Sequence, residues 1–334
     1  MADHGKPALR RAWGRAALAV WATLLAGPAA HAADLPRPPA PDANLDQRAR
    51  FAAMGTPAAL DARAVEAAFA PVRAEARGLR VLVVPAYLTD ALLPLRAVGL
   101  VGFFDEQERW LQGEGIAVAR APIVSAAAVR ENARHVAAAV RASDRPVCLL
   151  THSKGGLDAL AFLVAADEAA LAKVRCWVAL QAPFWGSPIA DLAADSALVG
   201  LASQPLLAIM GGSRESYMNL RVAERQEAMR RDAPGIARVA RQVSILSVAS
   251  WIDVTEGSWF VPSPYAATRR LMESAGLRND GLVPTDSSVL PGTRYVVLPN
   301  VEHAEVAIVP PLRSGSADRV PLTKLLLALA LERP

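Results

Sequence analysis

The chain has 334 residues, of which 53% are hydrophobic and 20% charged. This composition is sufficient for a sizeable folded core and is not that of a disordered protein. The formal net charge is +4, but residues 1–32 hold four basic side chains against one acidic one and so account for +3 of it. The remainder of the chain is close to neutral, and nothing in it predicts a nucleic-acid partner.

Residues 1–32 have the pattern of a secretory signal peptide. A basic region ending at Arg15 precedes a short apolar stretch, and Ala30-His31-Ala32 is a small-x-small cleavage site. The apolar stretch is too short to span a membrane as a helix. We therefore expect an exported protein, either periplasmic or extracellular.

The remaining chain divides into an extension, a core and an insertion. Residues 33–78 are expected to form an N-terminal extension that packs on the core. From residue 79, short apolar runs alternate with amphipathic segments, which predicts parallel strands joined by helices. The strands are expected at residues 79–84, 116–122, 146–150, 174–180, 243–248 and 294–298. Helices are expected at residues 103–112, 125–141, 157–169 and 321–331.

Residues 187–240 interrupt this alternation because they contain helical patterns and no strand pattern. A helical block inserted between two sheet strands is typical of a cap or lid over a pocket. The predicted fold class is therefore α/β, with a mostly parallel sheet, helices on both faces and an inserted helical cap. Its core is expected to comprise residues 79–186 and 241–334.

The most informative stretch is residues 147–156. An apolar run without charge ends in a polar turn that has Ser153 at its tip, and Gly155 and Gly156 precede the next helical pattern. Strand, sharp turn and helix together form the nucleophile elbow of the α/β-hydrolases, G-x-S-x-G. Thr151 occupies the place of the first glycine. The pattern predicts Ser153 as a nucleophile.

A serine nucleophile needs a general base, which is most often histidine. The chain has five histidines. His4 and His31 belong to the predicted signal, and His135 lies in a helix before the elbow strand. His152 adjoins the nucleophile and is expected to point away from its hydroxyl. His303, just after the last predicted strand, has the place that the order Ser, Asp, His requires.

The base in turn needs a carboxylate to fix its tautomer and orientation. Asp280 lies in an Asn-Asp-Gly turn one loop and one strand before His303, and is the preferred candidate. Asp253, which follows the strand at residues 243–248, is the alternative.

Two backbone N–H groups are expected to form an oxyanion hole. One is that of Lys154, directly after the nucleophile, and the other that of Tyr87, in the loop after the first core strand. The Lys154 side chain is expected to be a charge on the surface or one that lies behind the reacting residues without taking part in the reaction. Asp158 is expected to be a solvated or structural carboxylate.

The two cysteines, Cys148 and Cys176, fall in predicted strands that would be neighbours in the sheet. A bridge between adjacent parallel strands is geometrically awkward. Two buried free thiols are therefore the preferred expectation, with a disulfide as the alternative.

Three motifs in the same order resemble the bacterial triacylglycerol lipases and related α/β-hydrolase esterases. Residues 151–156 (THSKGG) match the nucleophile motif, residues 182–187 (APFWGS) are similar to a P-H-x-G-S segment, and residues 279–283 (NDGLV) match the turn that carries the catalytic aspartate. The resemblance covers about residues 79–310. It implies an exported serine carboxylester hydrolase with an acyl-enzyme mechanism and an apolar ester substrate.

That substrate is expected to be a small-molecule or lipid ester, and contact with a lipid interface follows from a lipid substrate. Phe184 and Trp185 replace a dipeptide that contains histidine in the family, and they are expected to add apolar surface to the substrate pocket. Some relatives bind structural calcium beside the histidine loop, where Glu305 lies. No second carboxylate matches, so neither a metal nor a cofactor is expected, with calcium as the alternative.

Two other functions remain open on the same fold. One is an acyltransferase or a depolymerase of an exported polyester. The other is a non-catalytic binding protein, which an intact set of Ser153, Asp280 and His303 argues against.

Overall fold

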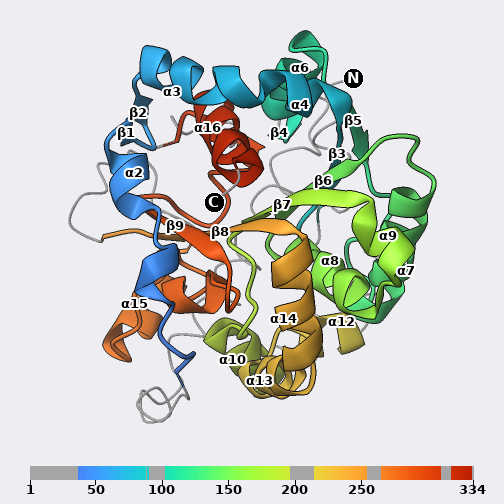
Figure 1. The fold of residues 1–334 in the computed structure, drawn as a ribbon. Helices are drawn as coiled ribbons and strands as arrows, with labels where there is room; N and C mark the ends of the chain where they lie inside the picture. Colours follow the sequence, from blue (N-terminus) through green and yellow to red (C-terminus); the bar gives the residue numbers. More distant parts are fainter. Residues whose placement is uncertain are drawn as a thin grey trace, which may run out of the picture.

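A six-stranded sheet, parallel throughout, forms the centre of the computed structural model, which describes residues 37–87, 89, 102–195, 214–253, 265–309 and 317–332 (Figure 1). The strand order is β5-β3-β6-β7-β8-β9, and every adjacent pair is parallel. The strands are β3 (Arg80–Val84), β5 (Ala117–Arg120), β6 (Val147–His152), β7 (Val174–Leu180), β8 (Ser244–Trp251) and β9 (Arg294–Pro299). The predicted parallel sheet is confirmed, and each strand overlaps the stretch expected for it.

Helices cover both faces of this sheet. Successive side chains of a strand point to opposite faces, so both faces of these strands are apolar and need a cover. On β3, Val81 and Val83 belong to one apolar cluster, and Leu82 and Val84 to another. The first cluster includes residues of α3 (Ala62–Phe69), α4 (Arg73–Gly78), α6 (Asp105–Gly113) and α16 (Arg319–Leu331). The second includes residues of α7 (Val129–Arg141), α8 (Lys154–Ala165), α9 (Glu168–Ala172) and α14 (Ala233–Gln242). Strands buried on both faces contain near-continuous apolar runs, as residues 81–84 of β3 and 147–150 of β6 do.

Two helix boundaries differ from the sequence-based expectation. Ser125 does not cap α7: the N-cap is Ala128, which makes no side-chain capping bond. The helix expected at residues 157–169 is two helices, because α8 ends at Ala165 and Asp167 caps α9 by accepting a hydrogen bond from the Ala170 N–H.

The N-terminal segment lies along the core. It contains η2 (Ala43–Leu45), α2 (Arg48–Ala52), β1 (Gly55–Thr56), β2 (Ala59–Leu60) and η3 (Ala70–Val72) in addition to α3 and α4. Asp46 forms a parallel β-bridge with Tyr295 of β9, and α3 packs against α16. Buried Val65 and Phe69 of α3 join the core cluster beneath α16.

The segment between β7 and β8 contains α10 (Pro188–Asp195), α12 (Arg214–Met218), α13 (Val222–Arg231) and α14. The apolar residues expected to form the centre of a cap, Leu198 to Met210, lie outside the described residues. Helix α14 packs against α8, α9 and β8, and a Cβ on its Gly235 would lie 2.7 Å from the Val164 side chain. It is therefore a crossover helix of the core, and the boundary expected at residue 240 runs through it.

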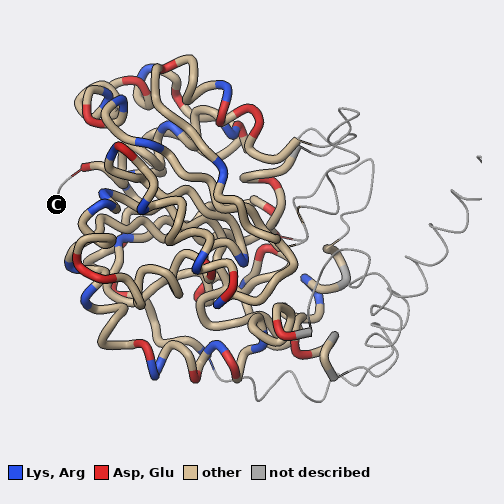
Figure 2. Tube along the Cα trace, turned by 90° about the vertical axis from the view of Figure 1, so that its right-hand side faces the viewer, with Lys and Arg blue, Asp and Glu red and all other residues tan. Residues whose placement is uncertain are grey.

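Three further elements lie outside the six-stranded sheet. They are α15 (Ala266–Ser274), η5 (Thr285–Ser288) and an antiparallel ribbon of β4 (Gly102–Phe103) with β10 (Ile308–Val309). Basic and acidic residues are interspersed along the described trace (Figure 2). None of the described helices is long and apolar enough to cross a membrane.

Cys148 and Cys176 form a disulfide, which corrects the expectation of two free thiols. They are direct partners in the register of β6 and β7, and they point to the same face of the sheet. The register shifts between Val147 and Cys148, and the two cysteine Cα atoms lie 4.5 Å apart. That separation falls within the range that a disulfide can span. A local register shift of this kind leaves no mark in the sequence.

We expect the double substitution Cys148→Ala/Cys176→Ala to lower the free energy of unfolding by about 3 to 4 kcal/mol. The reason is that the bridge closes a loop with a sequence separation of 28 and so restricts the unfolded chain. Urea denaturation of the oxidised wild type and the double variant measures the difference. Reductant should lower the wild-type midpoint and leave the variant unchanged, and equal midpoints for oxidised wild type and variant would contradict the prediction.

Candidate active site

Ser153 sits at a strained turn between β6 and α8. Its backbone has φ of 53° and ψ of −126°, a conformation that costs a non-glycine residue on the order of 1–3 kcal/mol. The Ser153 N–H donates to Leu180 O at 2.9 Å, and the Gly156 N–H donates to Ser153 O at 2.9 Å. These bonds hold the hydroxyl at the carboxyl end of the central strand, which is the geometry of a nucleophile elbow.

The small residues around the turn are required by close backbone contacts. A Cβ on Gly155 would lie 2.4 Å from Val84 O, and a Cβ on Gly156 would lie 2.4 Å from Ala182 Cβ. Thr151, which replaces the usual first glycine, is accommodated because it is fully buried and its hydroxyl accepts a hydrogen bond from Trp177 Nε1 at 2.9 Å. A threonine at this position is therefore compatible with the elbow.

The structure brings the three residues of the expected triad together. His303 Nε2 lies 2.8 Å from Ser153 Oγ, and His303 Nδ1 lies 2.9 Å from Asp280 Oδ2. The alternative carboxylate, Asp253, is exposed after the end of β8. The carboxylate on the imidazole is thus Asp280.

Asp280 is 1% exposed, and its turn prepares it to accept hydrogen bonds. Its Oδ1 accepts from the N–H groups of Leu282 and Val283 at 3.0 and 2.8 Å, which leaves Oδ2 for His303. The N–H of His303 also donates to Asp280 O at 3.0 Å, so the two residues are joined by main chain as well as side chain. Gly281 has φ of 102°, a left-handed conformation that favours glycine.

His152 points away from the Ser153 hydroxyl, as expected, and it is buried beside the base. Its ring centroid lies 5.0 Å from that of His303, and its Nε2 lies 2.7 Å from His303 O. Burial, followed by the proximity of His303, lowers the pKa of His152 to about 3. The ring is therefore neutral at physiological pH and adds no positive charge next to the base.

Lys154 is not a surface residue, so of the two expectations for its side chain the surface charge is wrong. Its side chain is 1% exposed and its ammonium donates to both carboxylate oxygens of Asp158, at 2.9 and 3.1 Å. Asn132 donates to the same carboxylate at 3.0 Å. Burial raises the pKa of Asp158 to about 6, against the lowering effect of Lys154. This buried pair joins the first and second turns of α8, where the Lys154 N–H lies at the positive end of the helix.

A cavity of about 330 Å³ opens at Ser153 and His303. Its lining is largely apolar and comes from several regions that are distant in sequence, among them the loop after β3, the start of α10, the segment around Leu220, the Asp280 turn and the His303 loop. Examples of the lining are Tyr87, Ile189, Leu220, Leu282, Val283 and Ile308. Tyr87, expected beside the site, does line this cavity, and its hydroxyl accepts from Ser216 Oγ at 3.4 Å.

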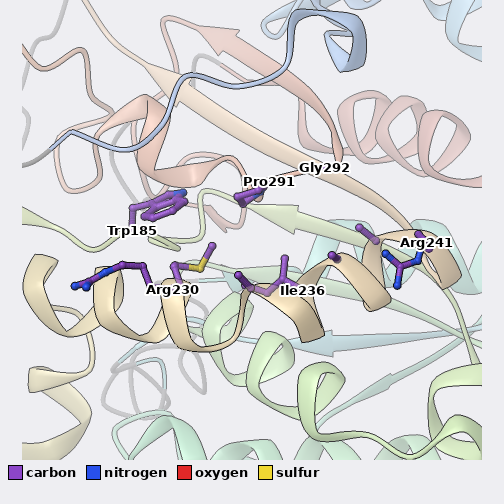
Figure 3. Close-up of a pocket in the computed structure, with 10 residues that line it drawn as sticks. Trp185, Arg230, Ile236, Arg241, Pro291 and Gly292 are labelled. Atoms are coloured by element: carbon purple, nitrogen blue, oxygen red, sulfur yellow. The ribbon is translucent and has the colours of Figure 1, made fainter.

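Phe184 and Trp185 do not line this cavity, which corrects their assignment to the substrate pocket. Phe184 is fully buried and packs edge-on against Trp177 at 5.7 Å. Trp185 lines a separate groove of about 420 Å³, in which it lies on the same side as Pro291 and across from Ile236 (Figure 3). Their neighbours Pro183 and Ser187 line the catalytic cavity instead. The sequence could not show whether Phe184 and Trp185 belong to the core or to the pocket, because consecutive residues of this loop point in different directions.

Glu305, the residue considered as a calcium ligand, is buried and its Oε2 accepts from the Glu302 N–H at 2.9 Å. Among the residues that the structure describes, no group of three or more His, Cys, Asp or Glu side chains is arranged to hold a metal ion.

Two solved structures that superpose on this chain are named a carboxyl esterase and a lipase. A metagenomic carboxyl esterase superposes with a TM-score of 0.60 at 20% identity, over 76% of this chain and 76% of the esterase. The mature form of a lipase from Bacillus licheniformis superposes with a TM-score of 0.52 at 19% identity, over 67% of this chain and 84% of the lipase. No protein-family model and no curated protein matches the sequence.

The parallel sheet and the shared architecture define the class of the protein: it has the α/β-hydrolase fold. Within that class it is similar to the lipases and esterases, which confirms the resemblance seen in the three sequence motifs. At this level of identity the likeness establishes the fold alone.

The buried neutral His152 should make the protein acid-sensitive. Its pKa in the folded state, about 3, lies below the ordinary value of 6.5, so the unfolded chain binds a proton that the folded chain does not. The resulting stability is fully present above about pH 6.5 and is lost as the pH falls towards 3, by about 2 kcal/mol at pH 5. Asp158, with a raised pKa, acts in the opposite direction in the same window.

Urea denaturation of wild type and His152→Gln at pH 7 and pH 5 isolates the histidine, because Asp158 is present in both. We expect the stability difference between the two proteins to shift by about 2 kcal/mol in favour of the variant on going to pH 5. The same difference at both pH values would show that His152 does not titrate in this way.

Proposed function

We propose that this protein is a serine carboxylester hydrolase that acts on apolar esters through an acyl-enzyme. The observation that carries the proposal is the continuous chain of contacts from Asp280 Oδ2 through His303 to Ser153 Oγ, at 2.9 and 2.8 Å. Hydroxyl, imidazole and buried carboxylate in that order form the arrangement that activates a serine for acyl transfer.

In the proposed first step, His303 Nε2 takes the Ser153 proton as the hydroxyl oxygen attacks the ester carbonyl. Asp280 holds the Nδ1 proton and stabilises the imidazolium. The backbone N–H groups of Lys154 and Tyr87 are proposed to bind the developing oxyanion. In support, Lys154 is the first residue of α8, and Tyr87 lines the same cavity as Ser153.

The tetrahedral intermediate collapses as His303 donates its proton to the leaving alcohol. A water molecule enters, loses a proton to the same imidazole and attacks the acyl-enzyme, and Ser153 is regenerated with release of the acid. The largely apolar lining of the cavity favours the acyl chain over a charged substrate, and its volume lies near the lower end of the range for ligand sites.

Hydrolysis of p-nitrophenyl esters from acetate to palmitate tests this proposal. We expect Ser153→Ala and His303→Ala each to lower kcat by about 10⁵- to 10⁶-fold, and Asp280→Asn by about 10⁴-fold, because the three residues act as one unit. The matched control is Asp253→Asn, which should keep near-normal rates. A folded wild type that is inactive on every ester, and that a fluorophosphonate probe does not label, would overturn the proposal.

We further propose that the protein works outside the cytoplasm, in the periplasm or beyond it. The signal-like residues 1–32 lie outside the described residues, so the support comes from their sequence pattern. The Cys148–Cys176 disulfide agrees with this location, because disulfides persist in oxidising compartments. N-terminal sequencing of the protein from a fractionated bacterial host should give Ala33 as the first residue, and an intact N-terminus in the cytoplasmic fraction would contradict export.

A further inference from the structure

Two adjacent residues of the elbow reach the same histidine from different sides. Ser153 Oγ contacts the ring of His303 at Nε2, and His152 Nε2 lies 2.7 Å from its main-chain carbonyl oxygen. Because a carbonyl oxygen only accepts, the His152 proton resides on Nε2 and is donated to His303 O. The segment that carries the nucleophile is thereby tied directly to the main chain of the base.

Gln181 makes a second connection to the same loop, one residue away from His303. It follows β7, is fully buried, and has φ of 50°, a left-handed conformation unusual for a residue other than glycine. Its Nε2 donates to Glu302 O at 3.2 Å and to the Ser250 hydroxyl, while its Oε1 lies 3.3 Å from His152 Nε2. The amide nitrogen and the amide oxygen of Gln181 therefore both have partners. Because the Glu302 carbonyl oxygen only accepts, the nitrogen faces Glu302 and the oxygen faces His152.

The main chain of His303 is thus held on both of its polar groups. Its N–H donates to Asp280 O at 3.0 Å, and its C=O accepts from His152. His303 lies in a loop after β9, and loops are usually the more mobile parts of a fold. Small displacements of a catalytic group are costly, because a misplacement of about 1 Å lowers the rate by about 100-fold.

We propose that His152 and Gln181 are positioning residues that hold the carbonyl groups of His303 and Glu302, and so keep the imidazole in line between Ser153 and Asp280. This inference rests on the proposed ester hydrolase function. Neither side chain reacts: each donates a hydrogen bond to the loop that carries the base. Removal of the donor lets the His303 main chain move while the three reacting side chains remain present.

A matched pair of substitutions at one position tests the role of the donor. His152→Gln places an amide N–H at about the reach of Nε2, whereas His152→Asn has the same chemistry but is one methylene shorter. We expect the Asn variant to lose kcat by about 10- to 100-fold with KM within about twofold of wild type. The rate at which a fluorophosphonate labels Ser153 should fall in parallel, and the Gln variant should recover most of both.

Gln181→Met supplies a second measurement, because methionine keeps the length of the side chain and removes its donor to Glu302 O. A lower kcat at unchanged KM is expected here also. The proposal is overturned if the Asn and Gln variants have equal kcat, if KM changes in place of kcat, or if folded Gln181→Met labels at the wild-type rate.

The same assays separate this inference from the function on which it rests. A wild type that hydrolyses esters, together with an inactive Ser153→Ala variant, establishes the hydrolase whatever happens at position 152. Failure of the wild type itself removes the proposed function, and the positioning role with it.

Discussion

The contact between Ser153 and His303 is the constraint on which the rest of the site depends. The two residues are 150 positions apart, and their side chains meet at 2.8 Å. A hydrogen bond of that length between distant segments requires that the sheet, the elbow and the last loop are each placed to within a fraction of an ångström. The close packing of Gly155 and Gly156, the strained backbone of Ser153 and the short hydrogen bonds of Asp280 are the means by which the chain achieves this.

The ionisable side chains of the elbow that pack around Ser153 and His303 add no net charge next to them. The ionisable groups nearest the elbow are neutral or paired: His152 is deprotonated by burial, and the Lys154 ammonium is bound to Asp158. A second positive charge next to His303 would oppose the imidazolium that the proposed acyl transfer requires. Ionisable residues therefore pack around Ser153 without placing a second positive charge next to His303.

Much of the architecture could be predicted from the sequence because the signals were local. Each strand was an apolar run of the right length, and the elbow, the Asn-Asp-Gly turn and His303 appeared in the order that the fold requires. The failures were properties of long-range packing. The orientations of Phe184 and Trp185, the burial of Lys154 and the register shift that joins Cys148 to Cys176 all depend on neighbours that the local pattern does not specify. The hydrogen bonds from His152 and Gln181 to the loop that carries His303 were missed for the same reason.

The disulfide also has a meaning for the alignment of the site. It joins β6 and β7 near their amino ends, and the carboxyl ends of the same two strands lead to Ser153 and Gln181. In a sheet, slippage by one residue would turn every side chain to the opposite face. A covalent cross-link at Cys148 and Cys176 fixes the register from there to the carboxyl ends of the two strands. The bridge thus fixes the register of the two strands whose carboxyl ends lead to Ser153, the proposed nucleophile, and to Gln181, the proposed positioning residue.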